Sequence, residues 1–249
     1  MDQEQNVFFG INPVLEKLRA SPKDILEILI AEGSSAPSLR GVDAQARRFG
    51  VPVRYVPAEL LDRLAAGQRH QGVSAKVFAF SYSSFSELLA AVRSLSGPFW
   101  ILILDSVTDP RNFGALLRTA ESVGVHHVLI PKDRSVAVTP TVINASAGAV
   151  HHLKIYRVTN LRRAISSLKE LGFWIVGLDA QASETIYNRV YPKQLAIVVG
   201  SEGAGIRPLL RRECDYLVCI PMRGRVSSLN VAVAGAVFLY ELVRQAQSH

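Results

Sequence analysis

Residues 99–118 read FWILILDSVTDPRNFGALLR and contain a strand, a turn and the beginning of a helix. The six apolar residues 99–104 are typical of a parallel strand that is buried on both faces. Asp109 and Pro110 favour a helix start, because aspartate accepts hydrogen bonds from free N–H groups and proline has none to satisfy. The stretch therefore predicts a strand followed by a helix over 112–123, the repeating unit of a parallel sheet.

The same alternation of strands and helices continues to residue 249. The expected strands are HHVLIP (126–131), LKIYRV (153–158), FWIVGL (173–178), QLAIVVG (194–200) and YLVCIP (216–221). Helices are expected at 160–172, briefly after IRP (206–208), and over a long final segment. We therefore predict an α/β domain at 98–249, with a mostly parallel sheet covered by helices on both faces. Ligands of such sheets bind beyond the carboxyl ends of the strands.

A smaller α/β unit precedes this domain. Residues 1–76 carry three short strand patterns, ILEILI (25–30), VPVRYV (51–56) and GVSAKVFAF (72–80), separated by helical patterns. The serine-rich residues 77–97 end at Gly97-Pro98 and are interpreted as a linker with one helix. Two domains in 249 residues agree with ordinary domain sizes.

The charge balance indicates the kind of partner. The formal net charge is +7 and the sequence pI is about 9.6, which favours a polyanion, most commonly nucleic acid. A generally basic surface is the alternative. The two cysteines, Cys214 and Cys219, cannot build a zinc site by themselves and indicate reduced thiols in the cytoplasm.

Other classes of protein are disfavoured. The first ten residues show no secretory signal, and the longest apolar stretch (229–239) is too short to span a membrane, so no membrane partner is expected. The pairs His126-His127 and His151-His152 lack neighbouring carboxylates or thiols, and no metal is expected.

Three polar loops that contain glycine follow the predicted strands. The first contains Asn112, Gly114 and Arg118 in the pattern N-x-G-x-x-x-R; a capped helix with a surface pair between Arg118 and Glu121 is the alternative. The second, VVGSEGAGI (198–206), has G-x-x-G-x-G spacing, which differs from the G-x-G-x-x-G of dinucleotide sites. Its glycines let backbone N–H groups meet a ligand, although a flexible turn also explains them.

The third loop, IPMRGRVSSLNVAVAGAV (220–237), leads into the last helix. Ser227 or Ser228 is expected to cap that helix, which accounts for one serine but leaves Ser228 and Asn230 together unexplained. The helix is apolar on all sides, so it needs cover from its own domain and from a second subunit.

Together, in this order, the three loops resemble the motifs of the SpoU/TrmH (SPOUT) family of RNA ribose 2′-O-methyltransferases. GINPVLEKL (10–18), HQGV (70–73) and DSVTDPRNFGALLR (105–118) look most like its bacterial RlmB subgroup, which methylates a guanosine in the peptidyl-transferase loop of 23S ribosomal RNA. The resemblance implies S-adenosylmethionine as methyl donor, a deep trefoil knot, a homodimer, and a first domain of the L30e type that binds RNA. The substrate is either naked RNA or an assembling pre-50S particle.

The resemblance also assigns roles to residues. The catalytic residues are expected to be Arg118, Asn112, Glu202, Ser228 and Asn230. The cofactor is expected to lie against Gly200, Ile220, Leu229, Gly205, Val199 and Met222. Basic residues expected to contact RNA phosphates are Arg47, Arg48, Arg54, Arg69, His70, Arg111, Arg223 and Arg225.

The sequence does not identify the group that accepts the proton. Arg118 matches the family's base, yet a guanidinium is effectively always protonated. Our hypothesis is that Arg118 binds the substrate phosphate and ribose, and that the proton leaves through phosphate, water or Arg118 itself. The alternative functions are a transfer RNA methyltransferase of the same family and a non-catalytic protein that binds RNA or assists ribosome assembly. An oxidoreductase that uses a nucleotide is disfavoured by the glycine spacing.

Overall fold

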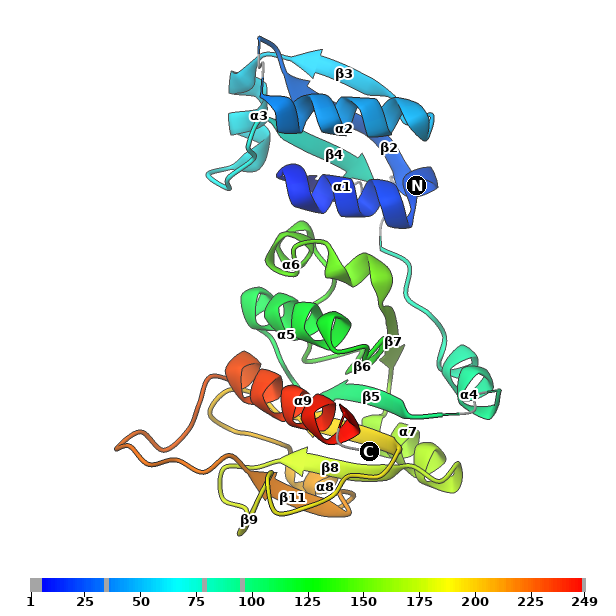
Figure 1. Cartoon of the computed structure of the whole chain (residues 1–249), viewed down its shortest axis with the longest axis vertical. Coiled ribbons are helices and arrows are strands. Elements are labelled where there is room, and N and C mark those ends of the chain that lie inside the picture. The colour runs from blue at the N-terminus through cyan, green and yellow to red at the C-terminus, as the bar shows by residue number, and fades with distance from the viewer. Residues whose placement is uncertain (1–5, 34–35, 78–79, 95–96, 248–249) are drawn as a thin grey trace. The chain divides into compact units, whose positions relative to one another are not determined.

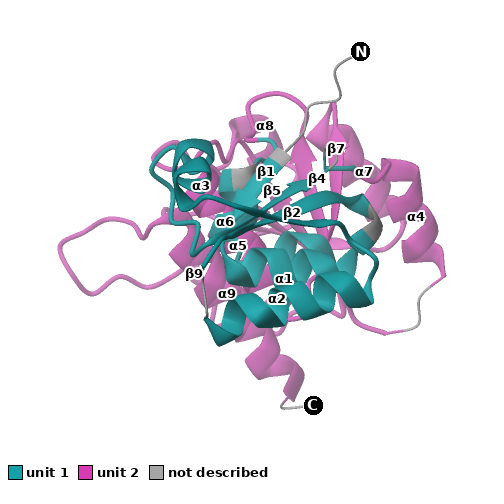
Figure 2. Ribbon diagram, turned by 90° about the horizontal axis from the view of Figure 1, so that it is seen from above, with its two compact units in different colours: residues 1–81, 137–152 teal, residues 82–136, 153–249 magenta. Residues whose placement is uncertain are grey.

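Two β-sheets, each with its own helices, make up the computed structural model of the chain (Figure 1). The structure describes residues 6–33, 36–77, 80–94 and 97–247. The chain forms two compact units, the first made of residues 1–81 with 137–152 and the second of 82–136 with 153–249 (Figure 2).

The first unit contains a four-stranded mixed sheet in the order β1-β4-β2-β3. Its strands are β1 (Asn6–Phe9), β2 (Ile25–Ala31), β3 (Val53–Val56) and β4 (Val73–Val77). Strand β2 is antiparallel to β4 and parallel to β3. Helices α1 (Ile11–Ala20), α2 (Pro37–Arg48) and α3 (Ala58–Ala65) complete the α/β domain expected at this end of the chain. Residues 78–79 and 95–96 lie outside the described residues. The first pair belongs to the third expected strand, and both pairs belong to the expected linker.

Residues 137–152 belong to the first unit, although the sequence analysis assigned them to the domain at 98–249. They contain helix α6 (Pro140–Ala145), whose Asn144 accepts a hydrogen bond from the N–H of Phe9 at 3.4 Å. Gly148 lies so close to Glu16 that a Cβ there would be 2.5 Å from the Glu16 Cβ. The sequence division missed this segment because contacts that hold it join distant positions, such as Phe9 and Asn144, which are 135 residues apart.

The second unit contains a seven-stranded sheet in the order β7-β6-β5-β10-β8-β11-β9. The strands are β5 (Phe99–Leu104), β6 (His127–Pro131), β7 (Lys154–Val158), β8 (Trp174–Leu178), β9 (Glu184–Thr185), β10 (Gln194–Val199) and β11 (Tyr216–Cys219). Their described pairings are all parallel. The mostly parallel α/β sheet is confirmed, and the trefoil knot stays a prediction.

Helices cover both faces of this sheet. Helices α4 (Phe85–Arg93), α7 (Leu161–Glu170) and α8 (Pro208–Arg211) share one core cluster with Ile101 and Ile103 of β5. Leu102 and Leu104 are also fully buried but lie outside that cluster, because alternate residues of a strand point to opposite faces. Helix α5 (Pro110–Ser122) lies beside the last helix, α9 (Val231–Gln247) (Figure 1).

The contact between α5 and α9 depends on a glycine. A Cβ at Gly235 of α9 would lie 2.4 Å from Cδ2 of Leu116 on α5, so the missing side chain lets the two helices approach closely. Helix α5 begins two residues earlier than predicted, because Asp109 is its N-cap and accepts hydrogen bonds from the N–H groups of Arg111 and Asn112, both at 2.8 Å. This packing places the N-terminal ends of both helices near the polar loops.

Candidate active site at the carboxyl ends of the strands

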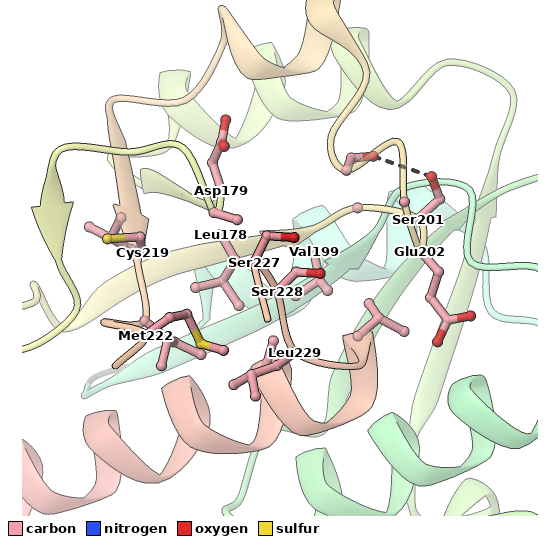
Figure 3. A pocket seen from close by; sticks show the side chains of 18 residues that line it. Leu178, Asp179, Val199, Ser201, Glu202, Cys219, Met222, Ser227, Ser228 and Leu229 are labelled. Atoms are coloured by element: carbon pink, nitrogen blue, oxygen red, sulfur yellow. Dashed lines mark hydrogen bonds between the residues drawn. The ribbon is translucent and has the colours of Figure 1, made fainter. Parts of the chain in front are cut away.

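A cavity lies beyond the carboxyl ends of β8, β10 and β11, where a parallel sheet is expected to bind its ligand (Figure 3). Glu202 lies at one end of the cavity and Cys219 and Met222 at the other (Figure 3). The lining residues come from the segments that end β8, β10 and β11 and from the start of α9: Leu178, Asp179, Ala180, Val199, Gly200, Ser201, Glu202, Gly203, Gly205, Val218, Cys219, Ile220, Met222, Ser227, Ser228, Leu229, Val231 and Ala234.

The wall formed by residues 200–206 is a closed turn. The N–H of Ser201 donates to the carbonyl of Gly205 and the N–H of Gly205 donates to the carbonyl of Ser201, both at 3.0 Å. A Cβ at Gly200 would lie 2.1 Å from the carbonyl carbon of Gly205 and 2.2 Å from the nitrogen of Ile206. Position 200 therefore requires glycine. The expectation that this loop's N–H groups meet a ligand must exclude those of Ser201, Ala204 and Gly205, which bond within the turn itself.

A hydrogen-bonded cluster joins the three loops. The Glu202 carboxylate accepts bonds from the side-chain amides of Asn112 and Asn230, both at 2.6 Å. The Asn230 amide also donates to the side-chain oxygen of Asn112 at 3.0 Å. These residues are 28 to 118 positions apart in the sequence. Bonds to an ionised acceptor are stronger than bonds between neutral groups, so the cluster fixes the three loops relative to one another.

Asn230 is also the residue that caps α9, which corrects the expectation that Ser227 or Ser228 does so. Its side-chain oxygen accepts the N–H of Ala232 at 2.9 Å and that of Val233 at 3.3 Å. Both serines instead line the cavity. The residue immediately before the first helical turn has the geometry to cap, and that residue is Asn230. One side chain thus anchors the helix through its oxygen and the cluster through its nitrogen.

The five expected catalytic residues divide into two sets. Glu202 and Ser228 line the cavity, and Asn112 and Asn230 are bonded to Glu202. Arg118 does not join them: it is exposed on α5 and is absent from the cavity lining. Within the described ranges, the side chain of Arg118 has neither a hydrogen-bond partner nor an ion pair, so the surface pair with Glu121 is not formed.

All six residues expected to contact the cofactor line the cavity. The sequence analysis missed Asp179 and Cys219, which follow or end strands β8 and β11 and line the same cavity. Their position at the carboxyl ends of predicted parallel strands is the signal that could have identified them. Asp105 and Arg207, which bond to each other next to the glycine turn, were not predicted either.

The basic residues expected to bind RNA lie on both units. Arg47 and Arg48 end α2, where Arg47 donates to Asp43 at 3.0 Å and Arg48 lies 5.9 Å from the centre of the Phe49 ring. Arg54 on β3 lies 3.4 Å from Glu27, and Arg69 is exposed. In the second unit, Arg111, Arg223 and Arg225 are exposed.

His70 has a structural explanation of its own. One ring nitrogen lies 2.9 Å from Asp62, and the other accepts the N–H of Gly72 at 3.1 Å. One nitrogen therefore contacts helix α3 and the other contacts the turn, and RNA contact by His70 stays a prediction.

The described residues contain no candidate metal site and no candidate membrane-spanning helix. No group of three or more histidine, cysteine, aspartate or glutamate side chains in the described ranges is arranged to hold a metal ion. No helix in the same ranges has the length and apolar character needed to cross a membrane.

Comparison with known families gives two matches along the chain. Residues 100–240 match the SpoU rRNA methylase family, and residues 7–83 match the RNA 2′-O ribose methyltransferase substrate-binding family. The substrate-binding match covers nearly all of the strands of the four-stranded sheet, and the methylase match covers most of the seven-stranded sheet.

Individual proteins are similar over nearly the whole chain. The 23S rRNA (guanosine-2′-O-)-methyltransferase RlmB of Bordetella pertussis is 45% identical over 97% of this chain and 98% of its own. Among solved structures, an RNA 2′-O ribose methyltransferase is 25% identical with a TM-score of 0.81, covering 98% of this chain and 90% of that one. The SpoU methyltransferase AviRb from Streptomyces viridochromogenes, solved with AdoMet, has a TM-score of 0.82 at 23% identity over 98% and 91% of the two chains.

Proposed function

Because this chain belongs to the SpoU rRNA methylase family, we propose that it methylates the 2′-hydroxyl of a guanosine ribose in 23S ribosomal RNA, with S-adenosylmethionine as the donor. The observation that supports this most directly is the junction of three polar loops at one cavity, joined through Glu202. We assign the target to the peptidyl-transferase loop. Ribosomal RNA as substrate favours a cytoplasmic location.

The cavity suits an adenosyl ligand. Its walls combine apolar side chains, including Leu178, Val199 and Leu229, with backbone of the glycine turn at 200–205. A flat apolar base needs such walls, while its polar edge needs backbone partners at close range. Gly200, Ile220 and Met222 line the same cavity, and we propose that they contact the ligand. When bound, S-adenosylmethionine supplies a methyl group already activated by its sulfonium.

The chain's own residues then have to position the ribose and handle one proton. Glu202 is held in one orientation by two amides, so its second carboxylate oxygen can accept a hydrogen bond from a substrate hydroxyl. The hydroxyl of Ser228 lines the same cavity and can do the same. We propose that Arg118 binds the phosphate and ribose of the target nucleotide, and that phosphate or water accepts the proton.

The position of Arg118 supports the proposal that the protein is a homodimer. It is exposed and absent from the cavity lining of its own chain, so a second subunit could supply it to the site. Helix α9 offers a surface for association: Val233 and Tyr240 lie seven residues apart on one face and are 48% and 55% exposed. Mixing an Arg118→Ala chain with a Glu202→Ala chain would restore part of the activity if sites are shared, and would restore none if each chain acts alone.

The RNA partner is supported by the first unit and by charge. Residues 7–83 match the substrate-binding family, and the chain carries a net charge of +7. Binding should weaken steeply with salt, because each phosphate contact releases counterions.

Two experiments test the proposal. Calorimetry should show that the purified protein binds S-adenosylmethionine; no binding would favour a non-catalytic RNA-binding protein. Ribose methylation should then be mapped in ribosomal and transfer RNA from cells that lack the gene. Loss of one guanosine methylation in 23S RNA supports the proposal, whereas loss of a site in transfer RNA only would assign the enzyme to the alternative substrate.

A further inference from the structure

Asp105 is a buried charged residue directly after β5, and the three loop motifs do not account for it. Its exposed fraction is 0%. One carboxylate oxygen accepts the N–H of Arg207 at 2.9 Å, and the other accepts Nε of Arg207 at 2.6 Å and the hydroxyl of Ser106 at 3.2 Å. A carboxylate is costly to bury unless its partners are in place. The burial of this carboxylate therefore requires that Arg207 and Ser106 keep their positions beside it.

The partners of Asp105 lie at the two ends of the glycine turn. The N–H of Asp105 donates to the carbonyl of Val199, directly before Gly200, at 2.8 Å. The side chain of Asp105 binds Arg207, directly after Ile206. One residue of the first loop therefore holds both the entry and the exit of the 200–206 turn. The close approach of Gly200 to Gly205 and Ile206 is compatible only with ends held near each other.

The backbone next to Asp105 adds a third observation. Ser106 has a φ of 63°, in the left-handed region that side chains other than glycine rarely adopt. Such backbone strain persists only where surrounding contacts hold it, and it is commonest at functional sites. The same segment continues to Asn112, which contacts Glu202 inside the turn. The first loop thus contacts the second loop at three places: at its beginning (Val199), at its end (Arg207) and at Glu202 between them.

We propose that Asp105 is a positioning residue that holds the 200–206 turn, through Arg207, in the shape that binds S-adenosylmethionine. This inference rests on the proposed function, since it concerns the cofactor wall of the same cavity. Asp105 is not among the residues that line the cavity, so it acts through the turn.

The test compares three variants of the full chain. Asp105→Asn removes the charge and leaves the side-chain shape. Arg207→Met removes the side-chain contact and keeps the backbone bond, at a position whose side chain is 39% exposed and therefore tolerant of change. Asp215→Asn is the matched control. Asp215 also accepts one bond from a cation, Lys169 at 2.7 Å, and one from a backbone N–H, that of Ile175 at 2.8 Å. It lies at the amino ends of β8 and β11, far along the strands from the cavity.

The measurements are the Kd of S-adenosylmethionine by calorimetry and the melting temperature. We expect Asp105→Asn to raise Kd by about tenfold to a hundredfold, which corresponds to charge-assisted bonds lost from the turn. Arg207→Met should raise Kd by about threefold to tenfold, because one bond remains. Asp215→Asn should lower the melting temperature and leave Kd unchanged.

The outcomes separate the inference from the proposed function. If the wild-type protein does not bind S-adenosylmethionine, the proposed function fails. If the wild type binds and both Asp105→Asn and Arg207→Met bind equally well, the role of Asp105 is only structural and the inference is overturned. If Asp105→Asn does not fold, the Kd of Arg207→Met decides alone: a wild-type value overturns the inference, and a raised value supports it.

Discussion

Gly200→Ala places a methyl group where the structure has no room for it. The new Cβ would lie 2.1 Å, 2.2 Å and 2.3 Å from three backbone atoms of Gly205 and Ile206. Carbon atoms pack at about 3.5–4.0 Å, so the opposing backbone must move by more than about 1 Å. Because these atoms are backbone, they cannot move away by a side-chain rotation. Overpacking costs about 1–3 kcal/mol, and we expect the upper part of that range, about 3 kcal/mol.

This cost predicts two measurable changes. For a chain of this size, about 3 kcal/mol lowers the melting temperature by roughly 6–12 °C. Because the displaced backbone is the cavity wall, the Kd of S-adenosylmethionine should rise more than about tenfold. Gly224→Ala is the control, since a Cβ there meets nothing within 4 Å and its φ is not positive. If Gly200→Ala matched the wild type in both melting temperature and Kd, the argument from close backbone approach would be refuted.

Three further predictions concern the cluster and the partly buried histidine His127. Asn230→Asp keeps the oxygen that caps α9 but puts a second carboxylate beside Glu202, so kcat should fall by tenfold or more. Repulsion between the two carboxylates should also lower the melting temperature. A wild-type kcat in Asn230→Asp would contradict the role assigned to the cluster. Glu202→Ala leaves two amides without their charged acceptor, and kcat/KM in a methyl-transfer assay should fall by about tenfold to a hundredfold; an unchanged value would remove Glu202 from the site. Burial, and then the charge of Lys154, lower the pKa of His127 to about 4, so the folded state holds this ring neutral where the unfolded chain binds a proton. The free energy of unfolding should thus decrease as pH falls from about 6.5 to about 4, and His127→Gln should show a shallower decrease in denaturant titrations across that window.

Strong local signals made much of the fold predictable. The apolar run at 99–104 predicted β5, and the helix start at Asp109-Pro110 predicted α5. Both signals can be read from residues that are neighbours in the sequence. Strand β1, helix α6 and the two-residue β9 were not predicted. Each is short, and its pairing or packing partners are distant in the chain. The assignment of residues 137–152 to the first unit has the same origin.

The cavity was predictable to a similar extent. The end of each parallel strand can be located in the sequence, and the six residues expected to contact the cofactor all line the cavity. The sequence could not separate Ser228 from Asn230 as the cap of α9, because both are good capping residues within three positions of the helix. It also gave no reason to select Asp105, whose importance depends on a contact 102 residues away.

By itself, the sequence determined the order of strands and helices, the three polar loops and their family, since these depend on neighbouring residues and on motif spacing. Only the tertiary structure decided that Glu202 accepts bonds from two asparagines and that Arg118 lies outside its own cavity. It also decided that Asp105 holds both ends of the glycine turn. The physical reason is that hydrogen bonds and close packing depend on distances in space, and a parallel sheet brings the ends of distant strands together.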